Sequence, residues 1–244
     1  MRLFLLLLLC PLTAQAGEVR AAVAANFTVA AQRIVEMFRA DTGHHVKLSY
    51  GSTGKLYSQI KAGAPFDVLL AADDTTPEKL VREGRGIPAS RYTYAIGKLV
   101  LWSKKPGFVD AQGHILQGRF DTLAIANPKL APYGMAAQET LESLGLWHGV
   151  KARIVMGESL SQTLQFADTG NADLAFIALA QTMKDGKPIA GSRWVVPMHL
   201  FNPIRQDALL LTQAQNRTAA EAFLKYLKGA KAAAVIKAFG YDLP

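Results

Sequence analysis

The chain has 244 residues, half of them hydrophobic, and a formal net charge of +8. Its Lys and Arg residues are scattered, with no basic run and no aromatic-basic stripe, which argues against a nucleic-acid-binding surface. The single cysteine, Cys10, lies in the N-terminal segment, so the rest of the chain has no thiol for a disulfide, a metal or a reaction.

The N-terminal segment has the three parts of an export signal. Arg2 is the positive region, Leu3 to Leu9 form the apolar run, and Ala14-Gln15-Ala16 is a cleavage site of small residues. We therefore predict a signal peptide over residues 1–16 and a periplasmic mature protein. A membrane anchor is one alternative, but the apolar run is far shorter than the roughly 20 residues that a spanning helix needs. A lipoprotein signal at Cys10 is another, disfavoured by the bulky residue before this cysteine and the proline after it.

Beyond residue 16, segments typical of strands and of helices alternate along the chain. In the first half the expected strands are 19–24, 46–50, 66–71 and one long strand over 92–102, with helices that start near Asn26, Thr53 and Thr76. In the second half the expected strands are 123–126, 152–156, 174–178, 194–197 and 203–212, with helices that start near Pro132 and Leu160 and two more around 223–228 and 232–239. The alternation is typical of an α/β fold with mainly parallel strands.

Two long apolar segments, 92–102 and 203–212, bracket the middle third of the chain, and no linker rich in Gly, Pro or Ser separates independent domains. This layout favours two α/β lobes joined by two hinge crossovers. We predict that lobe 1 comprises residues 17–95 and 204–244, and that lobe 2 comprises residues 96–203.

Two strand-to-helix turns in the first half are rich in hydrogen-bond donors and free of charged residues. They are Ala22-Val23-Ala24-Ala25-Asn26-Phe27-Thr28 and Leu48-Ser49-Tyr50-Gly51-Ser52-Thr53-Gly54. Taken alone, Asn26, Ser52 and Thr53 are ordinary helix N-caps. Two such turns at the carboxyl edge of one sheet bring backbone N–H groups and side-chain donors to neighbouring helix N-termini, where anions bind. The pattern predicts reversible binding of an anion by neutral donors.

Two further candidates lie at predicted helix starts in the second half. Tyr133 stands between Pro132 and Gly134, and it is either a packed aromatic residue or a phenol that donates to a ligand. Leu160 offers its backbone N–H, which has no partner within the helix at this position, and Ser159 is expected to cap that helix.

The sequence contains no recognisable motif for phosphate binding by a P-loop, metal binding or catalysis. The segment Gly51-Ser52-Thr53-Gly54-Lys55 lacks the spacing of a phosphate-binding P-loop, so Lys55 is interpreted as a solvated helix residue. The adjacent His44 and His45 lie in a predicted turn and do not have metal-ligand spacing. No nucleophile elbow or defensible pair of carboxylates occurs, and Asp73-Asp74 is expected to favour the start of the next helix through its dipole. We therefore predict that the protein is not an enzyme.

Over essentially the whole mature sequence, the chain resembles the periplasmic molybdate-binding proteins of ABC importers. Several segments carry the resemblance, each weak alone and specific together: Ala24-Ala25-Asn26-Phe27, Ser49-Tyr50-Gly51-Ser52-Thr53-Gly54, Gly63-Ala64-Pro65-Phe66-Asp67, Ala71-Ala72-Asp73, Tyr94 to Trp102, Asn127-Pro128, Ala131-Pro132-Tyr133-Gly134 and Lys225-Tyr226-Leu227-Lys228-Gly229. The resemblance implies a type II periplasmic-binding-protein fold. In that fold a tetrahedral oxyanion, molybdate and also tungstate, is held between two lobes by uncharged donors.

When the family's binding positions are carried over to this sequence, the resemblance implies six ligand-binding residues. They are Asn26, Ala25, Thr53 and Ser52 in lobe 1, and Tyr133 and the backbone of Leu160 in lobe 2. Many members have Ser in place of Asn26, a small residue in place of Tyr133, and Tyr in place of Ala178. The chain therefore resembles a variant branch in which Asn26 and Tyr133 supply donors that others place elsewhere.

The resemblance also implies the partners of the protein. It implies a monomer that needs no cofactor, binds no nucleic acid, and meets molybdenum only within the bound oxyanion, with no direct ligand from protein to metal. The implied membrane partner is an ABC transporter permease.

Three alternatives stay open from the sequence. The nearest is the same fold tuned to another oxyanion such as sulfate or phosphate, although a protonated phosphate would favour an acceptor carboxylate, which the two turns lack. An exported α/β transferase or hydrolase would need a nucleophile and a base within reach of one another. The third alternative is a periplasmic sensor whose ligand-bound form docks to a receptor.

Overall fold

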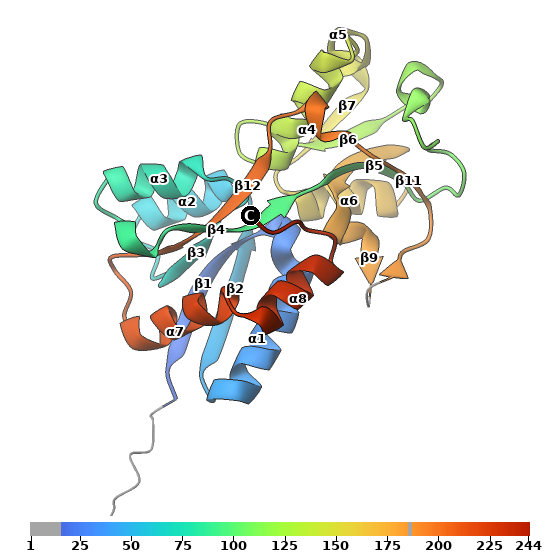
Figure 1. Ribbon diagram of the computed structural model, residues 1–244. Helices are drawn as coiled ribbons and strands as arrows, with labels where there is room; N and C mark the ends of the chain where they lie inside the picture. The colour runs from blue at the N-terminus through green and yellow to red at the C-terminus, as the bar shows by residue number, and fades with distance from the viewer. Residues whose placement is uncertain (1–15, 185–186) are drawn as a thin grey trace, which may run out of the picture.

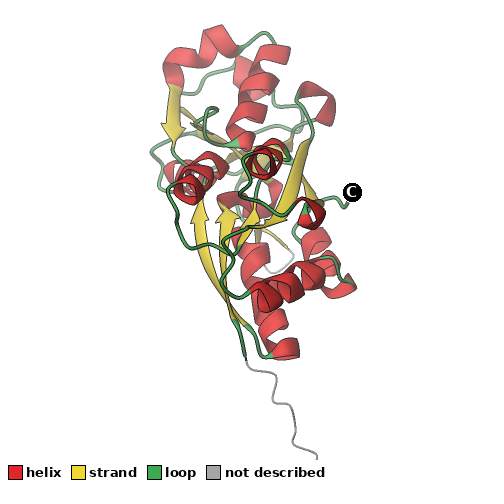
Figure 2. Ribbon diagram, turned by 90° about the vertical axis from the view of Figure 1, so that its left-hand side faces the viewer, coloured by secondary structure: helices red, strands yellow, loops and turns green. Residues whose placement is uncertain are grey.

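The computed structural model of the chain describes residues 16–184 and 187–244. It contains two five-stranded mixed sheets, each covered by helices on both faces, which lie one beyond the other along the molecule (Figure 1 and Figure 2). The predicted signal peptide, with the alternative at Cys10, lies outside the described residues except for Ala16. Within the described ranges, no helix has the length and apolar character that crossing a membrane requires.

The first sheet has the strand order β2-β1-β3-β12-β4, and we call this sheet with its helices lobe 1. β1 pairs in parallel with β2 and β3, whereas β12 runs antiparallel to β3 and β4. Its strands are β1 (Glu18–Ala24), β2 (His45–Gly51), β3 (Val68–Leu70), β4 (Tyr92–Gly97) and β12 (Ile204–Leu210). Its helices are η1 (Ala25–Phe27), α1 (Thr28–Thr42), α2 (Thr53–Lys61), α3 (Thr75–Arg82), α7 (Arg217–Leu227) and α8 (Ala230–Ala238). Helices α1, α7 and α8 pack on one face, and α2 and α3 on the other (Figure 1).

The second sheet has the order β11-β5-β8-β6-β7, and with its helices it is lobe 2. Its strands are β5 (Leu99–Ser103), β6 (Leu123–Ala126), β7 (Ile154–Gly157), β8 (Leu174–Ala178) and β11 (Ser192–Val195), and its helices are α4 (Pro132–Ser143), α5 (Trp147–Val150) and α6 (Leu160–Asp168). A short ribbon pairs β9 (Met183–Lys184) with β10 (Lys187–Pro188). Further single turns of 3-10 helix are η2 (Pro88–Ser90), η3 (His114–Gln117), η4 (Lys151–Arg153), η5 (Leu179–Thr182) and η6 (Met198–Leu200).

Helix α1 illustrates how the sequence pattern becomes packing. Ala31, Ile34 and Phe38 recur at helical spacing, and all three are fully buried in the core of lobe 1. Gly43 ends the helix in the left-handed region, with φ of 74°, and its N–H donates to the Arg39 carbonyl. The apolar stripe and the glycine stop are both local features, which is why the sequence predicts this helix well.

The predicted α/β fold is confirmed, but the predicted single strand over 92–102 is wrong. It is two strands, β4 and β5, which belong to different sheets and are separated only by Lys98. The sheets are also less parallel than predicted, because β4, β12, β5 and β11 pair antiparallel with their neighbours. An apolar run looks the same whichever sheet it joins, so periodicity alone cannot find this crossover. The lobe boundaries given from the sequence stay a prediction.

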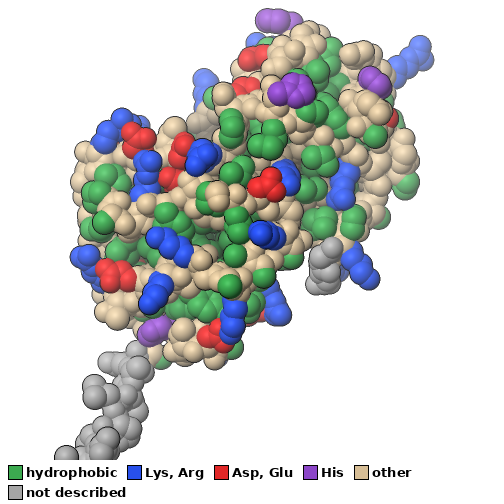
Figure 3. Space-filling view, in the orientation of Figure 1, with side chains coloured by type: hydrophobic (Ala, Val, Ile, Leu, Met, Phe, Trp, Pro, Cys, Tyr) green, Lys and Arg blue, Asp and Glu red, His purple; other side chains and the backbone are tan. Residues whose placement is uncertain are grey.

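Charged side chains are dispersed over the surface. Figure 3 shows Lys and Arg interspersed with Asp and Glu over both lobes on the face that it presents. Several form exposed ion pairs, such as Lys231 with Asp41 at 2.6 Å and Arg217 with Glu221 at 2.8 Å. Pairs of this kind contribute little to stability because water screens them.

Candidate functional site

A small cavity lies where the two lobes meet. In this closed arrangement its volume is about 10 Å³, close to the room that one water molecule needs. The residues that line it are Ala24, Ala25, Asn26, Gly51, Ser52, Thr53 and Ala72 from lobe 1, with Ala131, Pro132, Tyr133 and Leu160 from lobe 2. All six residues proposed from the sequence are in this set. Their roles as ligand donors stay a prediction.

Helix N-termini from both lobes converge on the cavity. Thr53 is the first residue of α2, Leu160 is the first residue of α6, and Tyr133 is the second residue of α4. Ala25 begins η1, which continues into α1. The N–H groups in a first turn have no partner within their helix, and the helix dipole places partial positive charge there. The cavity is therefore electropositive without a charged side chain.

Ser52 and Thr53 supply hydroxyl groups to the lobe 1 wall. Ser52 is 3 % exposed, and its Oγ is the single buried side-chain polar atom without a hydrogen-bond partner in residues 16–184 and 187–244. Because native proteins pair nearly all buried polar atoms, this hydroxyl is suited to a ligand. Thr53 Oγ1 accepts from the Ala72 N–H at 3.0 Å, which leaves its own hydrogen available to donate.

Asn26 differs from the sequence prediction in two ways. It is not a helix cap, because the N-cap of η1 is Ala24 and Asn26 lies inside that turn. Its Nδ2 donates to Gln206 Oε1 at 2.8 Å and to the Tyr241 hydroxyl at 3.2 Å, while Tyr241 donates to the Asn26 carbonyl at 2.8 Å. Both amide hydrogens are thus used inside the protein. The group that Asn26 can offer to an anion is its backbone N–H.

Tyr133 is a packed aromatic residue, and its role as a donor to a ligand stays a prediction. Its ring is packed in the core of lobe 2, and its hydroxyl accepts from Gln206 Nε2 at 3.3 Å. Burial raises the pKa of this phenol well above the ordinary value of 10, so it stays protonated and can donate. Gly97 makes room for it, since a Cβ there would lie 2.2 Å from the Tyr133 hydroxyl oxygen.

The N-terminus of α6 is held in place by two polar side chains. Ser159 caps the helix as predicted, with its Oγ accepting from the Gln162 N–H at 3.4 Å. Gln181, which the sequence analysis missed, donates to the Leu160 carbonyl at 3.2 Å and accepts from the Ala178 N–H at 3.1 Å. A polar residue directly after the apolar run 174–180 is the only sequence signal for Gln181.

The charged residues near the cavity lie at its margins. Among the described residues that line the cavity there is no Asp, Glu, Lys or Arg. Lys55 is an exposed residue of α2, as the sequence predicts, and it also forms an ion pair with Glu158 across the lobes. The Gly54 N–H donates to the Leu130 carbonyl at 2.9 Å, also between lobes. These contacts show that the lobes are closed on one another here.

Asp73 lies in a neighbouring groove of about 380 Å³ between the lobes. Its carboxylate accepts from the Thr76 N–H at 2.8 Å and from the Thr76 hydroxyl at 3.1 Å, which supports its predicted role at the start of α3. Burial raises the pKa of Asp73 from 3.8 to about 6, more than these hydrogen bonds lower it. The folded state therefore holds this proton more tightly than the unfolded chain.

We expect Asp73→Asn to stabilise the protein above pH 6. Because the folded protein holds the Asp73 proton more tightly, the protonated carboxyl group contributes to stability at low pH. This contribution is lost as the pH rises from 3.8, the pKa in the unfolded chain, through about 6, the pKa in the folded protein. Asparagine keeps an acceptor for Thr76 and removes the charge, so the free energy of unfolding at pH 8 should rise by about 1–3 kcal/mol. Urea unfolding at pH 5 and pH 8 measures this, with the exposed Asp121→Asn as control. An equal effect at both pH values would contradict it.

Comparison with models of known protein families shows which family this chain belongs to. The family model described as bacterial extracellular solute-binding protein matches residues 19–242. The chain belongs to this family. Solute-binding proteins of the family that resemble it closely include the molybdate-binding protein ModA of Azotobacter vinelandii, 57 % identical over 94 % of this chain and 92 % of the relative. The ModA protein of Rhodobacter capsulatus is 47 % identical over 94 % of this chain and 90 % of that protein.

A solved structure in the same family matches the fold closely. The Azotobacter vinelandii periplasmic molybdate-binding protein superposes with a TM-score of 0.91 and 44 % identity, covering 93 % of this chain and 99 % of that one. These solute-binding relatives are named as binding proteins. The resemblance stated from the sequence, and with it the type II periplasmic-binding-protein fold, is confirmed.

Proposed function

We propose that this solute-binding protein captures molybdate between its two lobes, after export to the periplasm, and delivers it to an ABC permease. The observation that carries the proposal is the neutral, donor-rich cavity, in which Ser52 Oγ has no hydrogen-bond partner among the residues that the structure describes. The two similar proteins named as molybdate-binding support the choice of ion. Tungstate has the same charge and shape and should bind too.

The proposed donors are the hydroxyls of Ser52 and Thr53, the N–H groups of Ala25, Asn26 and Leu160, and the phenol of Tyr133. A dianion has acceptors only, so a lining of donors without a carboxylate favours the fully ionised form. About six charge-assisted hydrogen bonds at roughly 1.5–3 kcal/mol each give on the order of 9–18 kcal/mol before ordering costs. Micromolar binding needs about 8 kcal/mol.

The chemistry of the cavity argues for transport rather than catalysis. A reaction needs a nucleophile next to a base, and the cavity-lining residues in the described ranges include no His, Cys, Lys, Asp or Glu. We propose that the protein acts as a monomer without a cofactor, and that the lobes separate to admit the ion and close around it. The molybdenum atom then meets only its own four oxygens.

Calorimetry with molybdate, tungstate, sulfate and phosphate tests the function. We expect molybdate and tungstate to bind with micromolar or tighter affinity. A ligand at about 1,000 times its Kd stabilises the folded state by about 4 kcal/mol, which raises Tm by roughly 8–16 °C for a chain of this size. No heat and no Tm shift with either ion would contradict the proposal. Binding of sulfate or phosphate more tightly than molybdate would support the alternative function, in which the same fold binds another oxyanion.

A further inference from the structure

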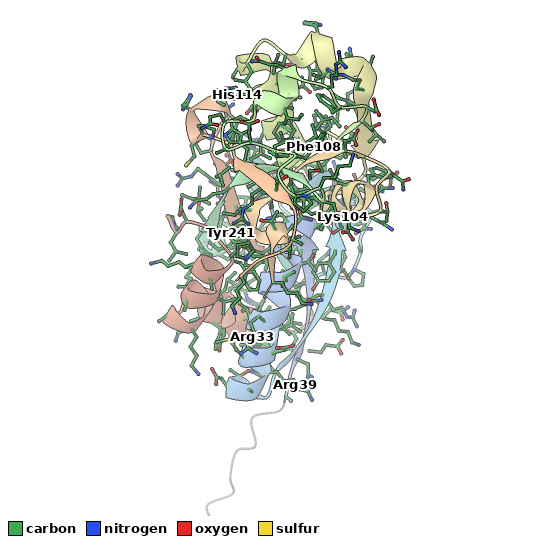
Figure 4. All side chains as sticks on the ribbon, turned by 90° about the vertical axis from the view of Figure 1, so that its right-hand side faces the viewer. Arg33, Arg39, Lys104, Phe108, His114 and Tyr241 are labelled. Carbon is green, nitrogen blue, oxygen red and sulfur yellow. The ribbon has the colours of Figure 1, made fainter. Side chains whose placement is uncertain are left out.

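Gln206 stands at the centre of a buried polar cluster behind the cavity. The Gln206 cluster consists of Asn26, Tyr94, Tyr133, Gln206 and Tyr241, and each of them is at most 4 % exposed. Tyr133 comes from lobe 2, and the other four come from segments of lobe 1. Figure 4 shows the labelled Tyr241 near the middle of the molecule, between the part of α1 that carries Arg33 and Arg39 and the part of the molecule that carries His114. The cluster therefore lies where the lobes meet.

Gln206 uses both ends of its side-chain amide. Its Oε1 accepts from Asn26 Nδ2 at 2.8 Å and from the Tyr94 hydroxyl at 3.1 Å. Its Nε2 donates to the Tyr133 hydroxyl at 3.3 Å. Asn26 and Tyr133 line opposite walls of the cavity, whereas Gln206 lies behind them and does not line it. One side chain thus links the two walls without touching the space between them.

The backbone around Gln206 is shaped for this contact. The register between β12 and β4 shifts between Gln206 and Asp207, and such a bulge redirects a side chain. On the facing strand, Gly97 leaves the space open, since a Cβ there would lie 2.9 Å from Gln206 Nε2. A fully buried side-chain amide is costly unless its polar atoms are paired, as the Oε1 and Nε2 of Gln206 are here.

We propose that Gln206 is a positioning residue, which holds Asn26 and Tyr133 in the geometry that binds the oxyanion and so links lobe closure to the shape of the cavity. This inference rests on the proposed function, because it concerns the same cavity. The bond from Gln206 Nε2 to Tyr133 Oη joins the lobes. Separation of the lobes breaks it, and closure around an ion restores it together with the position of the phenol.

A double-mutant cycle tests the role of Gln206. Wild type, Gln206→Met, Tyr133→Phe and the double variant are titrated with molybdate by calorimetry. Methionine keeps the length of the side chain and removes both polar ends. We expect Gln206→Met to weaken molybdate binding by about 10- to 100-fold, and we expect most of this loss to vanish in the Tyr133→Phe background. A general structural defect would weaken binding equally in both backgrounds.

Gln213→Met is the matched control. The Gln213 amide also lies in lobe 1 and donates to the carbonyls of Ala64 and Phe66, away from the cavity, so its loss should change affinity by no more than about twofold. Equal losses in the two backgrounds, or wild-type affinity of Gln206→Met, would overturn the proposal. Should Gln206→Met fail to fold, the same cycle applies to Gln206→Asn, which keeps an uncharged amide but is one methylene too short to contact both Asn26 and Tyr133. A wild-type protein that does not bind molybdate would overturn the proposed function and this inference together.

Discussion

Replacing Ser52 by aspartate is expected to weaken molybdate binding by on the order of 1,000-fold or more. Ser52 is the N-cap of α2 and lines the cavity with a buried hydroxyl. Aspartate is as good an N-cap as serine, so α2 should still form. A carboxylate about 4 Å from a bound anion costs about 4 kcal/mol per pair of unit charges at an effective dielectric constant of about 20. Calorimetry with molybdate measures the loss.

Ser52→Asn separates charge from size in this experiment. Asparagine has nearly the shape of aspartate, caps helices equally well and carries no charge. We expect this variant to lose about tenfold in affinity through crowding of the small cavity, far less than the aspartate variant loses. If Ser52→Asp and Ser52→Asn bound molybdate with similar affinity, a negative charge at position 52 would not affect the bound ion, and the proposed site would be wrong.

Gly97→Ala is expected to weaken molybdate binding by about 100-fold. The added Cβ would lie 2.2 Å from the Tyr133 hydroxyl oxygen and 2.8 Å from its Cζ, so the phenol must retreat from the position that it occupies in the closed structure. The ring is 1 % exposed and packed in the core of lobe 2, which leaves it little room. Gly97 ends the extended strand β4 and does not have a positive φ, so alanine causes no backbone strain there. The expected loss is therefore purely steric.

Gly149→Ala is the matched control for this substitution. Gly149 lies in α5 of lobe 2, and a Cβ there would meet no atom within 4 Å. We expect wild-type affinity from this variant. Calorimetry and thermal unfolding of both variants separate loss of binding from loss of fold. Wild-type affinity of Gly97→Ala would show that the position of the Tyr133 hydroxyl does not matter for the ion.

The candidate site could be predicted from the sequence because its parts are local. The turns at Ala25-Asn26 and Ser52-Thr53 each join a strand to a helix, and their donors follow from residue type and position in the helix. Leu160 follows from the same reasoning, because any first-turn N–H lacks a partner within the helix. These segments line one cavity. From the sequence this could be expected only through the general rule that α/β sheets bind ligands at the carboxyl ends of their strands.

Other features depend on contacts that no local pattern encodes. The direction of the Asn26 amide is set by Gln206, 180 positions away, and by Tyr241, 215 positions away. The ion pair of Lys55 with Glu158 also requires the two lobes to be brought together. In the sequence Gln206 is one of three consecutive polar residues, between Arg205 and Asp207, and nothing in this pattern identifies its partners.

The amino-acid sequence by itself determined the alternation of strands and helices, the donor-rich helix starts and the uncharged character of the proposed binding residues. These follow from periodicity and capping, which act over a few residues. Only the tertiary structure decided that the run 92–102 divides between two sheets, that Asn26 turns its amide inward, and that Gln206 joins Tyr133 to the opposite wall. The physical reason is that hydrogen bonds between distant segments exist only once both lobes have folded and closed.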